Sequence, residues 1–276
     1  MLTTEQREKE KRLRAYLRAA GSVLVAFSGG VDSTYLLKTA HDELGDAVCA
    51  ATSNSCLVPA RESDDAREFC AGEGIELIVL EATPLEIPGF ADNTPERCYL
   101  CKSVLLGALT ALARERGLAH VLDGSNIDDL GDVRPGMRAL KEQGVESPLI
   151  VCGFTKEDIR ACAHGAGLEV WDKPSAACLA SRIRTGEQIT PERLARIDAA
   201  EEHLRGLGLR QLRVRLLPGE VARIETDVEG RALLAGKTEL LAADLRKLGF
   251  ADVEPETALY QTGSMNLTAA DRPTPR

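Results

Sequence analysis

A glycine-rich turn at residues 28–33 has the composition of a phosphate-binding loop. The apolar run 23–27 before it is typical of a strand buried on both faces, and the residues from 33 onward predict a helix. N–H groups and the positive dipole end at a helix N-terminus favour an anionic phosphate. The turn matches neither a Walker A loop nor a dinucleotide fingerprint, and an ordinary strand–turn–helix is the alternative. The candidate phosphate-binding residues are Ser28, Gly29, Gly30, Val31, Asp32, Ser33 and, after the next strand, Ser53.

Asp32 lies one turn into this loop, where its carboxylate would repel phosphates unless a cation lay between them. Mg²⁺ binds carboxylates and nucleotide phosphates together, so the position predicts a Mg²⁺-dependent role. The alternative, which is compatible with the first, is a carboxylate favoured by the helix dipole. A second polar cluster at 123–129 could contact metal or substrate, or merely cap a helix. Arg134, in the following loop, could position an anionic group.

Cys98 and Cys101 form a Cys-x-x-Cys pair at the start of a predicted helix over 97–116. Such a pair fits a redox centre, half of a zinc site or part of an iron–sulfur site, but the sequence lacks a second pair that would complete a zinc site. If the loop containing Cys178 faces this helix, three thiolates converge. They can then hold a [4Fe–4S] cluster with one iron open to a ligand such as sulfide. The alternative is that Cys98 and Cys101 are unliganded thiols.

Arginines alternate with apolar residues near the C-terminal end, so that Arg213 and Arg215 lie on one face of a predicted strand. Together with Arg182, they could bind a phosphate through bidentate hydrogen bonds. Glu202 and Glu225 could balance these charges or bind a metal. The alternative is a solvated sheet face, where such charges contribute little.

Strands that alternate with helices predict an α/β fold with a parallel sheet and helices on both faces. After the first strand, the pattern predicts strands at 47–52, 76–80, 119–124 and 168–171, and helices at 4–20, 59–71, 97–116 and 156–164. Ligands in such folds bind at the carboxyl ends of the strands. We therefore expect the site in the loops at 28–33, 53–55, 124–129 and 173–181.

The pattern changes near residue 185, which predicts a small α+β domain over 185–262 after a first domain over 1–184. A helix at 191–204 with Thr190 as its N-cap precedes a hairpin with strands at 211–216 and 221–226. A helix at 233–248 and a last strand at 252–254 follow, and then a tail over 263–276.

Composition limits the function classes. The 276 residues have a net charge of −9 and a pI near 5.2, which disfavours non-specific nucleic-acid binding. The charged N-terminus has no signal-peptide pattern, and no apolar run approaches the length of a membrane span, so we expect a cytoplasmic protein. Eight cysteines in such a chain favour metal binding or sulfur chemistry over a disulfide framework.

The Ser-Gly-Gly-Val-Asp-Ser turn resembles the PP-loop of the ATP pyrophosphatases, which form a Rossmann-like, adenine nucleotide alpha hydrolase-like fold and cleave ATP between its α- and β-phosphates. The residues that follow are similar to the LarE-type ATP-dependent sulfur transferases over nearly the whole chain. The motifs that carry this resemblance lie at 97–102, 123–126, 134–136, 173–175, 178–182, 213–215 and 263–266.

This resemblance implies synthesis of a nickel-pincer nucleotide cofactor, used by lactate racemase and related enzymes. The implied substrate is pyridinium-3,5-biscarboxylic acid mononucleotide. ATP with Mg²⁺ adenylates a carboxylate, and sulfur then replaces AMP. One branch of the family sacrifices the cysteine matching Cys178, and another binds a [4Fe–4S] cluster through three cysteines. Because Cys98, Cys101 and Cys178 are all present, the chain resembles the second branch. The resemblance further implies a homo-oligomer, possibly a hexamer, and a substrate site made of Ser181, Arg182, Arg213 and Arg215 near Glu202 and Glu225.

Two alternatives stay open. A tRNA thiolation enzyme also combines a PP-loop with three cluster cysteines, but it would need a basic groove for RNA. A non-catalytic adenylate-binding or iron–sulfur scaffold would bind the same ligands without turnover.

Overall fold

The computed structural model describes residues 1–131 and 135–260, and these divide into two compact units. The first consists of Met1–Ala82 and Cys98–Ala176, and the second of Thr83–Arg97 and the residues from Ala177 onward. The patterns near residue 185 predict a later change of domain, whereas 83–97 and 177–184 already belong to the second unit. The motif at 263–266 and the tail lie outside the described residues.

A four-stranded parallel sheet forms the centre of the first unit. Its strands are β1 (Val23–Ala26), β2 (Val48–Asn54), β3 (Glu76–Glu81) and β4 (His120–Leu122), in the order β3-β2-β1-β4. The apolar run predicts β1 well, because all of Val23, Leu24 and Val25 are fully buried. Strand order reverses at β1, between β2 and β4, and this reversal is where α/β sheets bind ligands.

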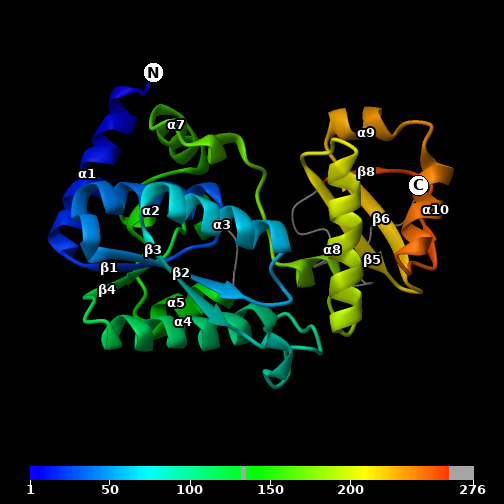
Figure 1. Ribbon diagram of the computed structural model, residues 1–276, viewed down its shortest axis with the longest axis horizontal. Coiled ribbons are helices and arrows are strands. Elements are labelled where there is room, and N and C mark those ends of the chain that lie inside the picture. The colour runs from blue at the N-terminus through cyan, green and yellow to red at the C-terminus, as the bar shows by residue number, and fades with distance from the viewer. Residues whose placement is uncertain (132–134, 261–276) are drawn as a thin grey trace. The chain divides into compact units, whose positions relative to one another are not determined.

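Helices cover both faces of this sheet, as the sequence predicts (Figure 1). Val23 and Val25 pack on one side with α1 (Thr4–Ala20), α2 (Val31–Leu44), α3 (Ala60–Glu73) and α7 (Lys156–Gly165). Leu24 packs on the other side with α4 (Arg97–Glu115) and α5 (Pro135–Gln143). Successive residues of a strand point to opposite faces, which explains this division.

Two apolar segments after β4 do not join the sheet. The run at 149–151 lies in the short helix α6 (Pro148–Val151), for which Pro148 supplies the favoured first residue. The predicted strand at 168–171 is wrong, because Glu169–Asp172 forms a 3-10 helix. Its backbone bonds are local, Trp171 N–H donating to the carbonyl of Leu168, and the Trp171 ring packs edge-on against His164 of α7.

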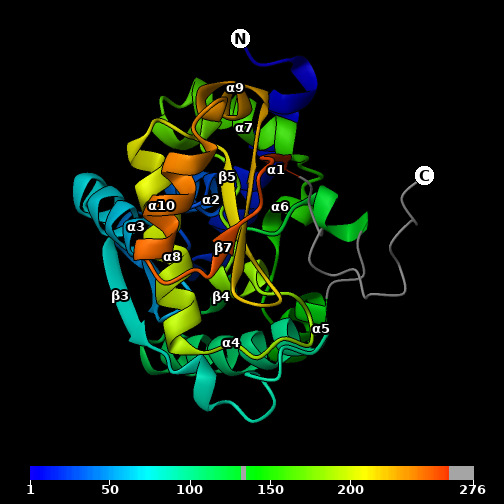
Figure 2. The same cartoon turned by 90° about the vertical axis from the view of Figure 1, so that its right-hand side faces the viewer.

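The second unit is built on an antiparallel hairpin, as the sequence predicts. Strands β5 (Leu212–Leu217) and β6 (Val221–Thr226) pair, and β7 (Asp252–Val253) and β8 (Ala258–Leu259) pair with β6 in parallel. Helix α8 (Pro191–Gly206) lies along β5, and Thr190 caps it by accepting from the Arg193 N–H (Figure 2). The single helix predicted at 233–248 is instead α9 (Val228–Leu234) and α10 (Thr238–Lys247), separated at Gly236 with φ +73°. Among the described residues, no helix is both long and apolar enough to cross a membrane.

Candidate active site

Ser33 holds the turn between β1 and α2 in its shape. Its hydroxyl donates to the carbonyl of Gly30 at 3.1 Å and lies 3.1 Å from the Ser28 hydroxyl. Gly29 has φ +69°, a conformation that only glycine adopts readily, whereas Gly30 is extended with φ −80°. Gly30 is the N-cap of α2 and has no side chain to occupy the first N–H groups of that helix. The turn is therefore shaped to accept an anion at the carboxyl end of β1.

Gly124, the second residue after β4, lies directly against this turn. A Cβ atom there would be 2.9 Å from the backbone nitrogen of Ser33 and 3.1 Å from its Cα. Only glycine allows such a close approach of two backbones. The loop after β4 therefore supports the phosphate-binding turn from the neighbouring strand.

We expect Gly124→Ala to destabilise the protein by about 1–3 kcal/mol and to weaken ATP binding, because the added methyl group must push the backbone of Ser33 aside. Gly107→Ala is the matched control, since its Cβ would first meet the flexible Gln143 side chain at an ordinary 3.6 Å. Thermal unfolding and ATP titration measure both effects. Wild-type behaviour of Gly124→Ala would contradict the close packing.

Asp32 stands in the first turn of α2, and Lys156 reaches it from the first residue of α7. Lys156 Nζ donates to Asp32 Oδ2, whereas Asp32 Oδ1 is buried and has no hydrogen-bond partner among the described residues. Burial raises the pKa of Asp32, although the charge of Lys156 opposes the shift. A buried oxygen of this kind lacks a partner that a cation or a water molecule could supply.

Most of the polar cluster at 123–129 shapes the local backbone. Asp128 accepts the backbone N–H of Lys156 at 2.7 Å, and its own N–H donates to the Asn126 side chain at 2.9 Å. Asp123 is buried and accepts from the hydroxyls of Ser125 and Ser147. These contacts correspond to the capping alternative, and Arg134 lies outside the described residues.

Lys173 fixes the turn from a third direction. Its Nζ donates to the carbonyl of Gly29 at 3.1 Å and pairs with Glu62 and Asp65 of α3, each at 2.8 Å. The lysine therefore neutralises two carboxylates next to the proposed phosphate position. Ser53, by contrast, is a residue of strand β2 itself, where it pairs with Leu80 of β3.

Lys173→Met should lower ATP affinity roughly tenfold or more, because a hydrogen bond from a charged donor is lost and two carboxylates remain facing the phosphates. Lys38→Met serves as the control: Lys38 also pairs with two carboxylates, Asp42 and Glu73, but it lies further along α2. Calorimetric titration with ATP compares the two variants. Equal affinities would show that Lys173 has no role in the site.

All eight cysteines lie in the described part of the chain, and none of them forms a disulfide. Cys98 and Cys101 occupy the first turn of α4 in the first unit, three residues apart and so on one face of the helix. Cys178 is exposed and belongs to the second unit. Of the five other cysteines, four are buried and Cys56 is exposed. Within the described residues, no group of three or more His, Cys, Asp or Glu is placed to hold a metal ion.

A cluster of charged side chains is buried in the second unit, at the position where the sequence left a solvated sheet face as the alternative. None of its five members is more than 4% exposed: Arg182, Glu201, Arg213, Arg215 and Glu225. Arg182 makes a bidentate pair with Glu201 at 2.8 and 3.0 Å, and Arg215 pairs with Glu225 at 2.8 Å. The balancing role proposed for Glu202 is wrong: Glu202 is exposed, and its neighbour Glu201 faces the arginines.

Burial disfavours the ionised forms of the charged groups in this cluster. Burial, followed by the charge of Arg182, lowers the pKa of Arg213. Burial disfavours ionised Glu201, but its bonds from Arg182 outweigh that effect and lower the pKa of the carboxylate. The Arg213 guanidinium also lies 5.3 Å from the ring centre of Tyr260. A negatively charged group close to Arg213 would therefore stabilise the buried cations.

Comparison with known proteins separates the possible functions of this arrangement. No family model matches the chain. The chain is 35% identical to pyridinium-3,5-bisthiocarboxylic acid mononucleotide synthase of Lactiplantibacillus plantarum, over 94% of both proteins. It belongs to the LarE-type family of ATP-dependent sulfur transferases. It is also 38% identical to an uncharacterized protein of Synechocystis, over 94% of the chain and 97% of that relative. A tRNA-specific 2-thiouridylase of Rickettsia felis is 28% identical over 56% of the chain and 52% of its own length.

As a LarE-type sulfur transferase, the chain is an ATP-using enzyme of the PP-loop type, and the turn at 28–33 is the candidate for that loop. Sequence reasoning missed Lys156 and Lys173 as contacts of the loop. Lys156 is the first residue of α7, whose capping box of Thr155 and Asp158 is visible in the sequence. The Lys156 side chain points towards Asp32 only because of the way α7 packs, which the sequence does not show. Lys173 lies within the Lys-Pro-Ser motif of the LarE-type resemblance.

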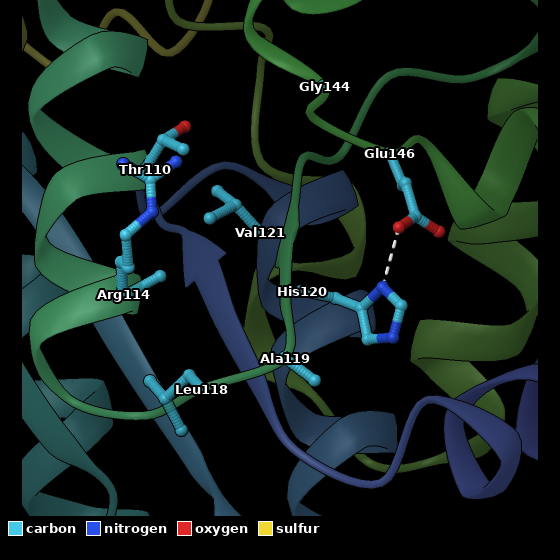
Figure 3. A pocket seen from close by; sticks show the side chains of 9 residues that line it. Thr110, Arg114, Leu118, Ala119, His120, Val121, Gly144 and Glu146 are labelled. Carbon is cyan, nitrogen blue, oxygen red and sulfur yellow. Dashed lines mark hydrogen bonds and ion pairs between the residues drawn. The ribbon is translucent and has the colours of Figure 1, made fainter.

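A cavity of about 230 Å³ lies at the amino-terminal end of β4, around His120, which is the first residue of that strand (Figure 3). Figure 3 shows the His120 ring facing the Glu146 carboxylate, and the two are 2.6 Å apart. Glu146 also accepts from the hydroxyl of Tyr16. Because ligands of open α/β sheets bind at the carboxyl ends of the strands, this cavity is separate from the candidate active site.

Proposed function

We propose that this protein inserts sulfur into pyridinium-3,5-biscarboxylic acid mononucleotide, using ATP, during synthesis of a nickel-pincer nucleotide cofactor such as that of lactate racemase. The observation that carries the proposal is the match to the Lactiplantibacillus plantarum synthase over 94% of both chains. The PP-loop supports the ATP step, and the buried arginine core supports recognition of a nucleotide phosphate.

The first half-reaction is adenylation. A carboxylate oxygen of the substrate attacks the α-phosphorus of ATP, the bond between the α-phosphorus and the bridging oxygen breaks, and pyrophosphate leaves. The loop N–H groups and Lys173 stabilise the charge that develops on the leaving group, which is commonly the largest catalytic contribution. The acyl-adenylate then has AMP as a leaving group in place of oxide.

Mg²⁺ fits this site, because Asp32 Oδ1 is buried, has no hydrogen-bond partner among the described residues, and is an oxygen ligand of the kind that Mg²⁺ binds. Bound Mg²⁺ would neutralise phosphate charge. Asp32 would hold the ion, and Lys156 would release Asp32 Oδ2 to contact a phosphate instead. A metal role for Glu202 or Glu225 has less support, since Glu202 is exposed and Glu225 is paired with Arg215.

The second half-reaction transfers sulfur. If Cys178 is the donor, its thiolate displaces AMP to form a thioester. Loss of the Cα proton to a base then breaks the Cβ–Sγ bond, leaving a thiocarboxylate and dehydroalanine. If sulfide is the donor, HS⁻ displaces AMP directly, giving a thiocarboxylate and a proton. Both routes balance without an oxidant or reductant, and a second round gives the dithiocarboxylate.

The thiol set fits a [4Fe–4S] cluster by its chemistry, because cysteine thiolates are the usual ligands of such a cluster and three of them would leave one iron open. Cys98, Cys101 and Cys178 would hold it, and the cluster would supply sulfide through its open iron. Anaerobic purification should then give a brown protein with roughly four irons per chain. A colourless, iron-free protein after reconstitution would leave Cys178 as a sacrificial donor.

The substrate phosphate would bind at Arg213 and Arg215, next to Arg182 and Ser181. Ser181 contributes its carbonyl to Arg215 at 3.0 Å and its hydroxyl to Arg182 at 3.1 Å. Guanidinium groups recognise phosphates through bidentate hydrogen bonds, which supports this assignment. We also propose that the protein is a cytoplasmic homo-oligomer such as a hexamer, which light scattering of the purified protein and cell fractionation would test.

A tRNA thiolation enzyme is the second candidate, and the Rickettsia felis relative favours it. The net charge of −9 and the shorter match, over 56% of the chain, weigh against it. A gel-shift assay with total tRNA at low salt separates the two functions. Tight, saturable binding would favour tRNA, whereas release of pyrophosphate that depends on the pyridinium dicarboxylate would favour the first proposal.

A further inference from the structure

Asn93 is an exceptional residue of the second unit. It is completely buried, and its φ of +54° is a left-handed conformation that non-glycine residues rarely adopt. Glu220, in the turn between β5 and β6, is the one other non-glycine residue with positive φ in the described part of the chain. Such a conformation persists where surrounding contacts enforce it, and it is concentrated at functional sites.

The Asn93 side chain binds the backbone of a single turn of the same unit. Its Nδ2 atom carries two N–H groups and lies within 3.3 Å of three carbonyl oxygens, those of Ile183, Arg184 and Glu187. The Asn93 carbonyl accepts from the Gly186 N–H at 2.9 Å. One buried amide therefore holds this entire turn together.

Arg97 extends this support to the residues just before the turn. Its Nη1 atom donates to Asn93 Oδ1 and, at 3.2 Å, to the carbonyl of Ala180. The oxygen and the nitrogen of the Asn93 amide are thus both engaged. Asn93 and Arg97, which belong to the second unit, act together on residues 177–187 of that unit, which we call the 177–187 segment.

The 177–187 segment has a second support, which is strand β5. Arg215 of β5 donates from Nη1 to the carbonyl of Ser181 at 3.0 Å. Ile183 forms a parallel bridge with Leu216, the next residue of that strand. The segment also contains Arg182, which takes part in the buried charged cluster. Its position relative to β5 therefore sets how Ser181 and Arg182 lie against the arginines of that strand.

The two supports differ in what they depend on. The contacts with β5 include Arg215, one of the side chains proposed to bind the substrate phosphate. The contacts of Asn93 and Arg97 use none of the proposed phosphate-binding side chains. They can therefore hold the segment in the same place whether or not an anion is bound at the arginines.

We propose that Asn93 and Arg97 are positioning residues of the second unit, which hold Ser181 and Arg182 in register with β5 for binding of the substrate phosphate. The functional consequence rests on the proposed function, in which the phosphate binds at this cluster. A preorganised site binds more tightly, because the segment does not have to be ordered when the ligand arrives. The ATP-binding turn belongs to the first unit, so ATP affinity should not depend on this support.

Hydrogen exchange followed by mass spectrometry tests the positioning without substrate. Four backbone N–H groups donate within this network, and their exchange reports on its order: those of Ser181, Ile183, Gly186 and Glu187. We expect Asn93→Gly to speed exchange in peptides covering 177–187 about tenfold or more, the effect of losing a buried hydrogen bond. Peptides of β6 and α10 should exchange at the wild-type rate. Glycine adopts positive φ without strain, so this variant removes the side-chain contacts alone.

Glu220→Gly is the matched control. It also replaces a left-handed residue of the second unit by glycine, and it removes ion pairs with Arg193 and Arg196. It should leave exchange in the 177–187 segment unchanged. Wild-type exchange there in Asn93→Gly, or equal acceleration throughout the second unit, would overturn the proposed positioning.

Arg97 provides a second variant that leaves the buried amide in place, so that the test stands even if Asn93→Gly does not fold. Arg97→Met should speed exchange around Ala180, because the contact with its carbonyl is lost. Arg97→Lys keeps one charged donor and should restore slow exchange in part. Wild-type exchange with Arg97→Met would exclude Arg97 from the support.

Pyrophosphate release measures the functional consequence. Asn93→Gly should raise the KM for pyridinium-3,5-biscarboxylic acid mononucleotide about tenfold and leave kcat and the KM for ATP near their wild-type values, as expected when only ground-state binding is weakened. An equal rise of both KM values would indicate a merely structural role and contradict the proposal. If the wild-type protein releases no pyrophosphate with this substrate, the proposed function fails, whereas hydrogen exchange still decides whether Asn93 and Arg97 hold the 177–187 segment.

Discussion

Cys178→Ser is expected to abolish thiocarboxylate formation while pyrophosphate exchange with the pyridinium dicarboxylate continues near the wild-type rate. Cys178 is exposed and belongs to a different unit from the PP-loop, so its loss should not disturb ATP binding. A serine hydroxyl can neither supply sulfur nor ligate iron as a thiolate does. Mass spectrometry of the product and a radiolabelled pyrophosphate exchange assay measure the two half-reactions in parallel.

Two further substitutions make this result specific. Cys56→Ser removes a different exposed thiol, which belongs to the first unit, and it should change neither half-reaction. Cys98→Ser distinguishes the sulfur sources: it should stop repeated turnover if a cluster delivers sulfide, but leave a single turnover if Cys178 is consumed. Thiocarboxylate formation by Cys178→Ser at the wild-type rate would refute any role of this cysteine.

Asp32→Asn should slow adenylation by about 10²–10³-fold, the usual cost of removing one preorganised electrostatic contact to a developing charge. The amide keeps the shape of the side chain, but it cannot hold a cation or balance the charge of Lys156, which pairs with Asp32. Asp42→Asn, which removes a carboxylate paired with Lys38 further along α2, is the matched control and should have no effect. Adenylation by Asp32→Asn at the wild-type rate would exclude Asp32 from the reaction.

The same residue predicts a pH dependence. Burial raises the pKa of Asp32, so the protonated form is favoured in the folded protein. Its contribution to stability is therefore present below the unfolded-state pKa, near 3.9, and is lost as pH rises through the folded-state value. Mg²⁺-dependent ATP binding should weaken on acidification at a pH above the ordinary aspartate range. ATP titration across acidic pH should show this loss in the wild type, and Asp32→Asn should lack it.

The strand, turn and helix that carry the proposed phosphate-binding residues are predictable from sequence because their determinants are local. A buried apolar strand, two glycines and a helix start occupy one continuous stretch, and the structure forms β1, the turn and α2 there. Gly29 takes the positive φ that the pattern permits, whereas Gly30 serves as an extended N-cap. The distant lysines were missed, since their direction depends on how α7 and the chain after it pack against α2.

A second feature that the sequence predicts poorly is the exact position of a side chain or a boundary within a helix or strand. In a helix, adjacent residues point in directions about 100° apart, so choosing Glu202 over Glu201 moves the carboxylate from a buried arginine to solvent. The segment 168–171 has the alternating pattern of a strand. Local hydrogen bonds instead make it a 3-10 helix, and Trp171 packs on His164 of α7. In the same way, Gly236 divides one amphipathic stretch into α9 and α10.

The central claim is that one ATP is cleaved to AMP and pyrophosphate for each sulfur atom placed on the pyridinium dicarboxylate. The most direct measurement incubates the purified, anaerobically prepared protein with ATP, Mg²⁺ and this substrate, and quantifies AMP and thiocarboxylate by mass spectrometry together with the intact mass of the protein. We predict equal amounts of AMP and incorporated sulfur. A loss of one H₂S, about 34 Da, from the protein accompanies each transfer only if Cys178 is the donor. Formation of ADP instead of AMP, or AMP without any sulfur-containing product, would contradict the account.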